Sequence, residues 1–425
     1  MSEWKEYKLG DICDITSSRR IFLNEYVKEG VPFYRSKEII EKAKGNNIST
    51  ELFITNERYD EIKRKNFVPV ENDILITSVG TLGVSYMLSK KDFFYFKDGN
   101  LTWLRNYSNL VYPKYLLYWL RSNIAKEKFN EISIGSTQPA ITIQGLKGLQ
   151  LKLPKHSTQT TIAEILSSLD DKIELNNKIN HELETLAQTL FKQWFIDFEF
   201  PNENGEPYKS SGGEMVESHL GEIPKGWETK TLNDITNISI GRTPPRQEHQ
   251  WFSTDINDVK WISIRDMGNC GAYIHNTSEF LTEDAIIKFN IPIIEKNTLI
   301  MSFKLTVGRV SITTERMLSN EAIAHLNINN SEIYPEFLYL FLKQFNFDSL
   351  GSTSSIATAV NSKSIKSLPL IFPKIDILSK FEDIITPLFS RINNLTFENK
   401  DITNLRNTLL PKLISGELEI NETNN

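Results

Sequence analysis

The sequence contains only two cysteines and no long apolar run. Cys13 and Cys270 stand far apart, which argues against a disulfide framework and a cysteine-based zinc site and favours a reducing compartment. No run approaches the roughly 18 apolar residues that a transmembrane helix needs. The first residues, MSEWKEYKLGD, are polar and charged, unlike a secretory signal. We therefore expect a cytoplasmic chain with no membrane partner.

Motifs for catalysis are also missing. The one Pro-Pro pair, Pro244–Pro245, lacks the preceding acid or amide and the following aromatic residue with which an adenine methyltransferase grips a flipped base. No phosphate-binding glycine loop occurs, and the six histidines lack metal-ligand spacing. Asp60-Glu61-Ile62-Lys63 loosely fits a nuclease pattern but is more typical of a charged helix face. The sequence thus predicts no catalytic and no metal-binding residues.

Positive charge is scarce overall, since the net charge is −6, but it is unevenly distributed. Residues 1–154 carry +5, residues 155–224 carry −8, residues 225–374 are neutral and residues 375–425 carry −3. The acidic excess therefore lies in two segments, which leaves room for local basic surfaces elsewhere.

The chain is a tandem repeat with a period of about 220 residues. WKEYKLGDICDI at Trp4 matches WETKTLNDITNI at Trp227, and YPKYLLYWL at Tyr112 matches YPEFLYLFL at Tyr334. ENDILITSVGTLG near Asn72 matches EKNTLIMSFKLTVG, and GSTQPAIT matches GSTSSIAT. The blocks keep one order, which indicates duplication rather than coincidence.

Each copy begins with about 150 residues of short β-like runs and ends in a helical segment. Apolar residues in the second helical segment recur in alternating steps near four and three, as in a heptad seam, and Asn399 occupies one seam position. Pro387 is expected to kink or restart this helix. A long helix with one apolar stripe needs a partner. The two helices are expected to pair with each other; the alternative is that each packs on its own head.

These patterns predict an α+β fold in which two mixed α/β heads form a pseudo-two-fold tandem repeat, separated by two long helices that pair as an antiparallel coiled coil. The expected parts are the first head (1–154), a central helix (155–200), a connector rich in Pro, Gly, Ser and Asn (201–226), the second head (227–374) and a C-terminal helix (375–416).

The chain resembles a known family, the specificity subunits of type I restriction–modification enzymes. The motifs that carry the resemblance are FKQWFIDFEFP, GGEMVES, LGEIPKGW, LLPKLISGEL, GSTQPAIT with QTTIAEILSSLDDKIELN, and GRTPPR with KWISIRDM. It covers the whole chain, although the heads are the variable part of such proteins. The second head departs from the pattern because GSTSSIATAV lacks the usual Gln after Gly-Ser-Thr.

The resemblance implies that the heads are target-recognition domains for double-stranded DNA. It also implies two modification (methyltransferase) subunits carrying S-adenosylmethionine and translocating restriction subunits using ATP and Mg, with no cofactor in this chain. Two other classes stay open: an autonomous DNA methyltransferase or nuclease, and a coiled-coil scaffold whose heads bind protein.

We expect DNA contacts from side chains that can donate hydrogen bonds to base edges or phosphates. In the first head they are Arg19, Arg20, Arg35, Lys37, Ser78, Thr81, Ser136, Thr137 and Gln138. In the second head they are Arg242, Thr243, Arg246, Arg265, Lys304, Arg309, Ser352 and Thr353.

Overall fold

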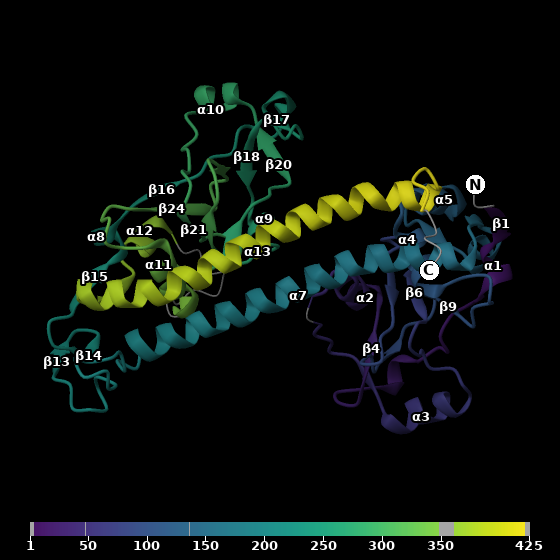
Figure 1. Ribbon diagram of the computed structural model, residues 1–425, viewed down its shortest axis with the longest axis horizontal. Helices are drawn as coiled ribbons and strands as arrows, with labels where there is room; N and C mark the ends of the chain where they lie inside the picture. Colours follow the sequence, from purple (N-terminus) through teal and green to yellow (C-terminus); the bar gives the residue numbers. More distant parts are fainter. Residues whose placement is uncertain (1–3, 47, 136, 348–360, 421–425) are drawn as a thin grey trace. The chain divides into compact units, whose positions relative to one another are not determined.

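The computed structural model describes residues 4–46, 48–135, 137–347 and 361–420 (Figure 1). The chain forms two compact units. The first unit consists of Met1–Glu174 together with Asp401–Asn425, and the second unit is Leu175–Lys400. Two long helices, α7 (His156–Phe195) and α13 (Ile375–Ser415), each contribute one part to each unit.

Two four-stranded sheets form the head of the first unit. One sheet is antiparallel and has the order β2-β9-β6-β7, with strands Asp14–Thr16, Leu101–Arg105, Ile74–Thr77 and Ser85–Met87. The other has the order β3-β5-β4-β8, with strands Tyr26–Val27, Phe53–Ile54, Val31–Tyr34 and Tyr95–Phe96, and its β4–β8 pair is parallel. Two further pairs are β1 (Lys5–Lys8) with β12 (Gln150–Leu153) and β10 (Ser133–Ile134) with β11 (Ala140–Ile141).

The head of the second unit has the same plan. Its first sheet has the order β16-β24-β21-β22-β19, with strands Thr236–Ile240, Ile323–Ile328, Leu299–Ser302, Val310–Thr313 and Tyr273–Ile274. Its second sheet has the order β17-β20-β18-β23, with strands Phe252–Ser253, Glu279–Leu281, Val259–Ile262 and Leu318–Ser319, and β18–β23 is parallel. The pair β15 (Glu228–Thr231) with β25 (Pro369–Phe372) corresponds to β1 with β12. The repeated strand order confirms the duplication predicted from the sequence.

Short helices recur at equivalent places in the two heads. Each Tyr-Pro pair starts one of them, because proline is favoured at the first helical position: α4 is Pro113–Arg121 and α11 is Pro335–Gln344. The others in the first head are α1 (Leu9–Ile12), α2 (Ser36–Ala43), α3 (Asn56–Arg64), α5 (Asn123–Ile132), α6 (Ile143–Gly148) and the 3-10 turn η1 (Leu23–Glu25). Those in the second head are α8 (Leu232–Ile235), α9 (Ile264–Met267), α10 (Glu283–Phe289), α12 (Ser362–Lys366) and η2 (His249–Trp251).

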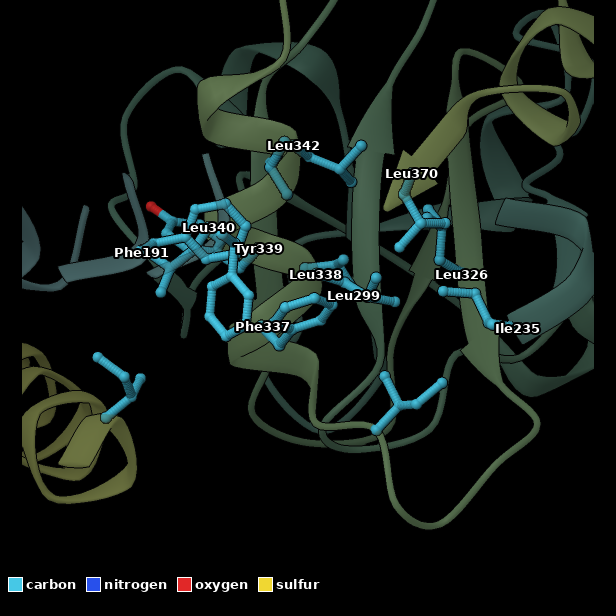
Figure 2. Packing of buried hydrophobic residues seen from close by; sticks show 14 of the residues in the cluster. Phe191, Ile235, Leu299, Leu326, Phe337, Leu338, Tyr339, Leu340, Leu342 and Leu370 are labelled. Atoms are coloured by element: carbon cyan, nitrogen blue, oxygen red, sulfur yellow. The ribbon is translucent and has the colours of Figure 1, made fainter. Parts of the chain in front are cut away.

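The largest core of each unit joins its head to the long helices. In the second unit, α11 packs against β21 and β22 and meets Phe191 of α7 (Figure 2). Phe191, Phe195 and Phe381 form a tilted and edge-on aromatic cluster there. In the first unit, Ile162 and Leu166 of α7 share a core with Leu413 and Ile414 of α13. Both long helices are therefore anchored in both units by buried apolar side chains.

The two long helices pack together antiparallel. Within the second unit, Asn176 donates to Glu398 Oε2 at 2.8 Å and to Asn399 Oδ1 at 2.9 Å, and Asn180 donates to Thr396 Oγ1 at 3.2 Å. The residue number on α13 falls as the residue number on α7 rises, so the two helices run in opposite directions. Within the first unit, Arg406 pairs with Asp170 at 2.5 Å. The predicted helical pair is thus confirmed.

The connector between α7 and the second head has regular structure. It contains the antiparallel hairpin β13 (Met215–Ser218) and β14 (Gly221–Pro224). Cys13 and Cys270 are free thiols. In the described part of the chain, no helix combines the length and the hydropathy needed to cross a bilayer.

Candidate nucleic-acid interface

In the first head, the loop Lys97–Asn100 between β8 and β9 holds several distant segments together. The Lys97 amide donates to Tyr34 O at 2.8 Å, and the Ser78 amide donates to Asn100 O at 2.9 Å. The Ser36 hydroxyl also donates to Asn100 O, at 3.3 Å. These bonds bring the ends of β4, β6 and β8 and the start of β9 to one place.

Two more segments join this group of loops. Gly99 donates its amide to Ser17 Oγ at 3.3 Å, and Arg20 pairs with Asp98 at 2.9 Å. The Gly80 amide donates to Pro139 O at 3.1 Å, which connects the turn after β6 to the β10–β11 hairpin. We call the loops 17–22, 34–37, 78–83, 97–100 and 137–141 the first rim.

The first rim therefore gathers most of the residues that the sequence singled out in this head. Lys37 and Thr81 are exposed, as are Thr137 and Gln138. Arg19 is exposed, with its guanidinium 5.2 Å from the centre of the Phe67 ring. Arg35 is half-buried and bonds Glu38 at 2.8 Å. Ser136 lies outside the described residues.

Ser78 is not on the surface. Its side chain is 2% exposed, and its hydroxyl lies 2.6 Å from that of Thr102. Its amide and carbonyl also bond neighbouring loops, to Asn100 and Ile141. Ser78 thus holds the first rim in shape, and its side chain has no free donor for DNA.

The second head repeats this construction around Asn320–Ala322. The Asn320 amide donates to Ile262 O at 3.1 Å, and the Phe303 amide donates to Ala322 O at 3.0 Å. These bonds correspond to those of Lys97 and Ser78 in the first head. Arg242 donates its amide to Ser319 O at 2.9 Å. We call the loops 241–246, 263–268, 303–309 and 319–322 the second rim.

The turns that follow β6 and β21 share their hydrogen bonds. Gly83 donates to Thr77 O at 2.9 Å, and Gly308 donates to Ser302 O at 3.0 Å. The hydroxyls of Thr77 and Ser302 each accept the amide one residue further on, from Val84 at 3.0 Å and Arg309 at 3.1 Å. A fully buried hydroxyl therefore closes the base of each turn.

The second rim likewise gathers most of its predicted residues. Arg265 and Lys304 are exposed, and their side chains make no hydrogen bond or ion pair within the described chain, although the Lys304 ammonium lies 5.5 Å from the centre of the Phe303 ring. Arg242 donates to Phe289 O at 2.9 Å, and Arg309 donates to Ile264 O at 2.6 Å. Ser352 and Thr353 lie outside the described residues.

Arg246 and Thr243 are engaged with carboxylates. Arg246 makes two bonds to Glu279, at 2.7 and 3.1 Å, and stacks over Phe252 and Trp261 at 4.4 and 4.7 Å. Thr243 bonds Glu321. Burial raises the pKa of Glu321, but the Thr243 hydrogen bond and the nearby charges of Lys304 and Arg246 outweigh it, so the pKa lies below its ordinary value. Glu321 thus stays ionised and accepts the hydrogen bond from Thr243.

The sequence reasoning missed the two central loops, Lys97–Asn100 and Asn320–Ala322. A signal was present, because both loops stand just before the strands β9 and β24 in equivalent positions of the repeat. Their role is carried by backbone groups, which no residue-type pattern reveals.

The nuclease-like run Asp60-Glu61-Ile62-Lys63 lies on α3. Glu61 pairs with Arg58 at 2.6 Å and Lys65 at 2.9 Å. The hydrogen bonds from Lys65 and Arg58 lower the pKa of Glu61 to about 2. These contacts match a charged helix face. Among the described residues, no three or more His, Cys, Asp or Glu side chains are grouped to hold a metal ion.

Comparisons with known proteins agree on one family. The model described as "Type I restriction modification DNA specificity domain" matches residues 1–185 and 224–404. The chain is 30% identical to the type I restriction enzyme HindI specificity subunit of Haemophilus influenzae, covering 98% of this chain and 100% of the relative. It is 28% identical to the MjaIX specificity subunit of Methanocaldococcus jannaschii, covering 99% and 94%.

A solved structure has a similar fold. The S subunit of a type I restriction-modification system from M. genitalium aligns with a TM-score of 0.58 at 19% identity, covering 97% of this chain and 96% of that one.

Proposed function

We propose, because this chain belongs to the type I restriction modification DNA specificity family, that its two heads read the two halves of a bipartite target in double-stranded DNA. The observation that carries the proposal is the shared framework of the two rims. Equivalent backbone bonds hold Lys97 and Ser78 in one head and Asn320 and Phe303 in the other. Each head therefore presents one comparable set of loops, as a reader of one half-site requires.

Within each rim the residues divide into two groups. Exposed cations whose side chains have no acceptor among the described residues, such as Lys37, Arg265 and Lys304, are suited to phosphates or guanine edges. Cations that already bond carboxylates or carbonyls, such as Arg20, Arg35, Arg242, Arg246 and Arg309, shape the loops. Of these, Arg242 and Arg309 bond carbonyl oxygens, so they also add positive potential. Thr81, Thr137 and Gln138 offer neutral donors and acceptors beside them.

This chain selects the DNA sequence, and its partner subunits carry out methylation and cleavage. Two modification subunits would carry S-adenosylmethionine and methylate adenine, and restriction subunits would use ATP and Mg to translocate and cleave, all in the cytoplasm. The acidic segments 155–224 and 375–425 make the long helices suited to basic partner surfaces. Native mass spectrometry should show two modification subunits per chain, and a stable one-to-one complex active on both strands would contradict this stoichiometry.

Methylation mapping tests the function. The chain is combined with its modification subunits, and N6-methyladenine is mapped in exposed DNA. Residues 1–154 are then exchanged for the first head of another family member. We expect one half-site to change and the other to persist. If both half-sites changed together, the two heads would not read separate half-sites. Methyl transfer by the chain alone would identify it as an autonomous enzyme, and either result would refute the proposal.

A further inference from the structure

Leu305 stands at the tip of the turn between β21 and β22 in the second rim. Its side chain is 96% exposed, although leucine is among the most frequently buried residues. Its φ is +64°, a left-handed conformation that leucine rarely adopts. Both the exposure of Leu305 and its positive φ are therefore unusual for a leucine.

The turn itself is tight. The Thr306 amide donates to Lys304 O at 2.7 Å, which closes a γ-turn with Leu305 at its centre. A γ-turn with positive φ is rare and strained, and such strain persists where the surroundings fix the backbone. Here they do, because Ser302 is fully buried and its hydroxyl bonds Thr306 O at 2.6 Å and the Arg309 amide at 3.1 Å.

The first head shows what the backbone alone would require. The position equivalent to Leu305 is Gly80, which has φ +77° and open space around it. Glycine adopts this conformation at no steric cost. The backbone therefore does not require a leucine at the tip, and the apolar side chain is what distinguishes the second head at this position.

The surroundings point to DNA as the surface that Leu305 meets. Lys304 precedes Leu305 in the sequence. The positive charges of Lys304 and Arg246 both lower the pKa of Glu321, so the tip of the turn lies near these two cations of the second rim. Lys304 and Thr306 are polar, so the apolar area at the tip is one isobutyl group. The matching apolar group on base edges is the C5-methyl of thymine in the major groove. We infer that Leu305 contacts the C5-methyl group of one thymine in the half-site read by the second head, an inference that rests on the proposed function.

The test removes the methyl group from the DNA and the side chain from the protein. The chain is assembled with its modification subunits, and the target is first mapped by methylation. Duplexes are made with each thymine of the second half-site replaced, one at a time, by deoxyuridine. We expect one replacement to weaken binding about fourfold, as for burial of one methyl-sized group, and replacements in the first half-site to show no dependence on residue 305.

Two variants separate the contact from the turn. Leu305→Gly reproduces the residue of the first head, and Leu305→Asn places a residue that tolerates positive φ. Both should bind the thymine duplex about fourfold more weakly and no longer distinguish it from the sensitive deoxyuridine duplex. Ile256→Ala, which removes another apolar side chain of this head, 75% exposed, should leave the discrimination intact.

Three outcomes overturn the inference. The first is that wild-type protein binds every deoxyuridine duplex as tightly as the thymine duplex. The second is that the half-site contains no A·T pair. The third is that the variants lose affinity equally for both duplexes and keep the preference for thymine. Failure of the proposed function is distinct, because the wild-type complex would then show no sequence-selective binding at all.

Discussion

Asn180 of α7 and Asn399 of α13 make equivalent hydrogen bonds across the helical pair. Asn180 donates to Thr396 at 3.2 Å, and Asn399 donates to Asn177 at 2.8 Å. The two donors are 219 residues apart, as are the two acceptors, and the same spacing relates Ile173 to Ile392. The duplication therefore extends to individual polar contacts, and these contacts fix the register of the pair.

The two asparagines should differ in their contribution to stability. Asn399 also accepts a hydrogen bond from Asn176, whose side chain is fully buried. In Asn399→Ala, the buried amide of Asn176 loses this acceptor and keeps only its bond to Glu398. We expect Asn180→Ala to cost about 1 kcal/mol and Asn399→Ala about 2 kcal/mol. Urea denaturation followed by tryptophan fluorescence measures both. The exposed Asn394→Ala is the control and should change stability by less than about 0.5 kcal/mol.

His325 should make the second head sensitive to acid. It is fully buried on β24, with its ring nitrogens near Ser319 at 2.7 Å and Ser239 at 3.1 Å, and burial lowers its pKa to about 4. An unfolded histidine titrates near 6.5, so the unfolded state binds the extra proton between these values. Stability is therefore full above pH 6.5 and falls by up to about 3 kcal/mol as the pH drops through 4.

The matched pair of variants is His325→Gln and His181→Gln. The first removes the buried titration, and the second removes an exposed histidine of α7. Stability of the His325→Gln protein should depend less steeply on pH between 6.5 and 4. Equal slopes for both variants would show that carboxylates alone cause the acid sensitivity.

Lys304 should contribute to DNA binding whatever the target sequence. Lys304 follows β21 within the second rim, whereas Lys296 is exposed just before the other end of the same strand. We expect Lys304→Ala to weaken binding of the assembled complex and to reduce the slope of log K against log salt by about 1, the value for one lost phosphate contact. Lys296→Ala should leave the slope unchanged, and a similar loss from both variants would place the phosphate contact elsewhere.

Gly83 and Gly99 offer a comparison at one backbone angle, since both have φ +77°. A Cβ on Gly99 would meet open space, but a Cβ on Gly83 would lie 2.6 Å from the buried Phe129 ring. Gly99→Ala should cost about 1 kcal/mol from strain alone. Gly83→Ala should cost a further 1–3 kcal/mol, roughly, and displace the turn after β6. Thermal unfolding compares the two, and equal losses would mean that Phe129 simply moves aside.

The fold was largely predictable because the repeat and the heptad seam are patterns of residue type. Asn399 stands at the predicted polar seam position and does bond across it. Pro387 was expected to kink or restart its helix, but α13 runs from Ile375 to Ser415 without interruption. Pro387 lies on the exposed side, as does Asp383, whose carbonyl loses its donor and can bond water instead.

The rims were less predictable because residue type does not show what already occupies a side chain. Arg246 looked like a base reader, yet it is bonded to Glu279 and stacked on Trp261, contacts that depend on strands distant in sequence. Ser78 was chosen as a surface hydroxyl, but the chain buries it. Leu305 carried no signal, since its exposure and its positive φ belong to the folded turn alone.

The first unit is completed by residues that follow the second unit in the sequence. Leu413 and Ile414 are buried in the core that contains Ile162 and Leu166, and Gly416 lies against Trp4. On the ribosome, the second unit is fully synthesised once Lys400 is added, whereas the core that joins the first head to the long helices also needs Leu413 and Ile414. A stop codon between Lys400 and Leu413 should therefore damage the first head, and on the proposed function the half-site lost would be the one assigned to residues 1–154.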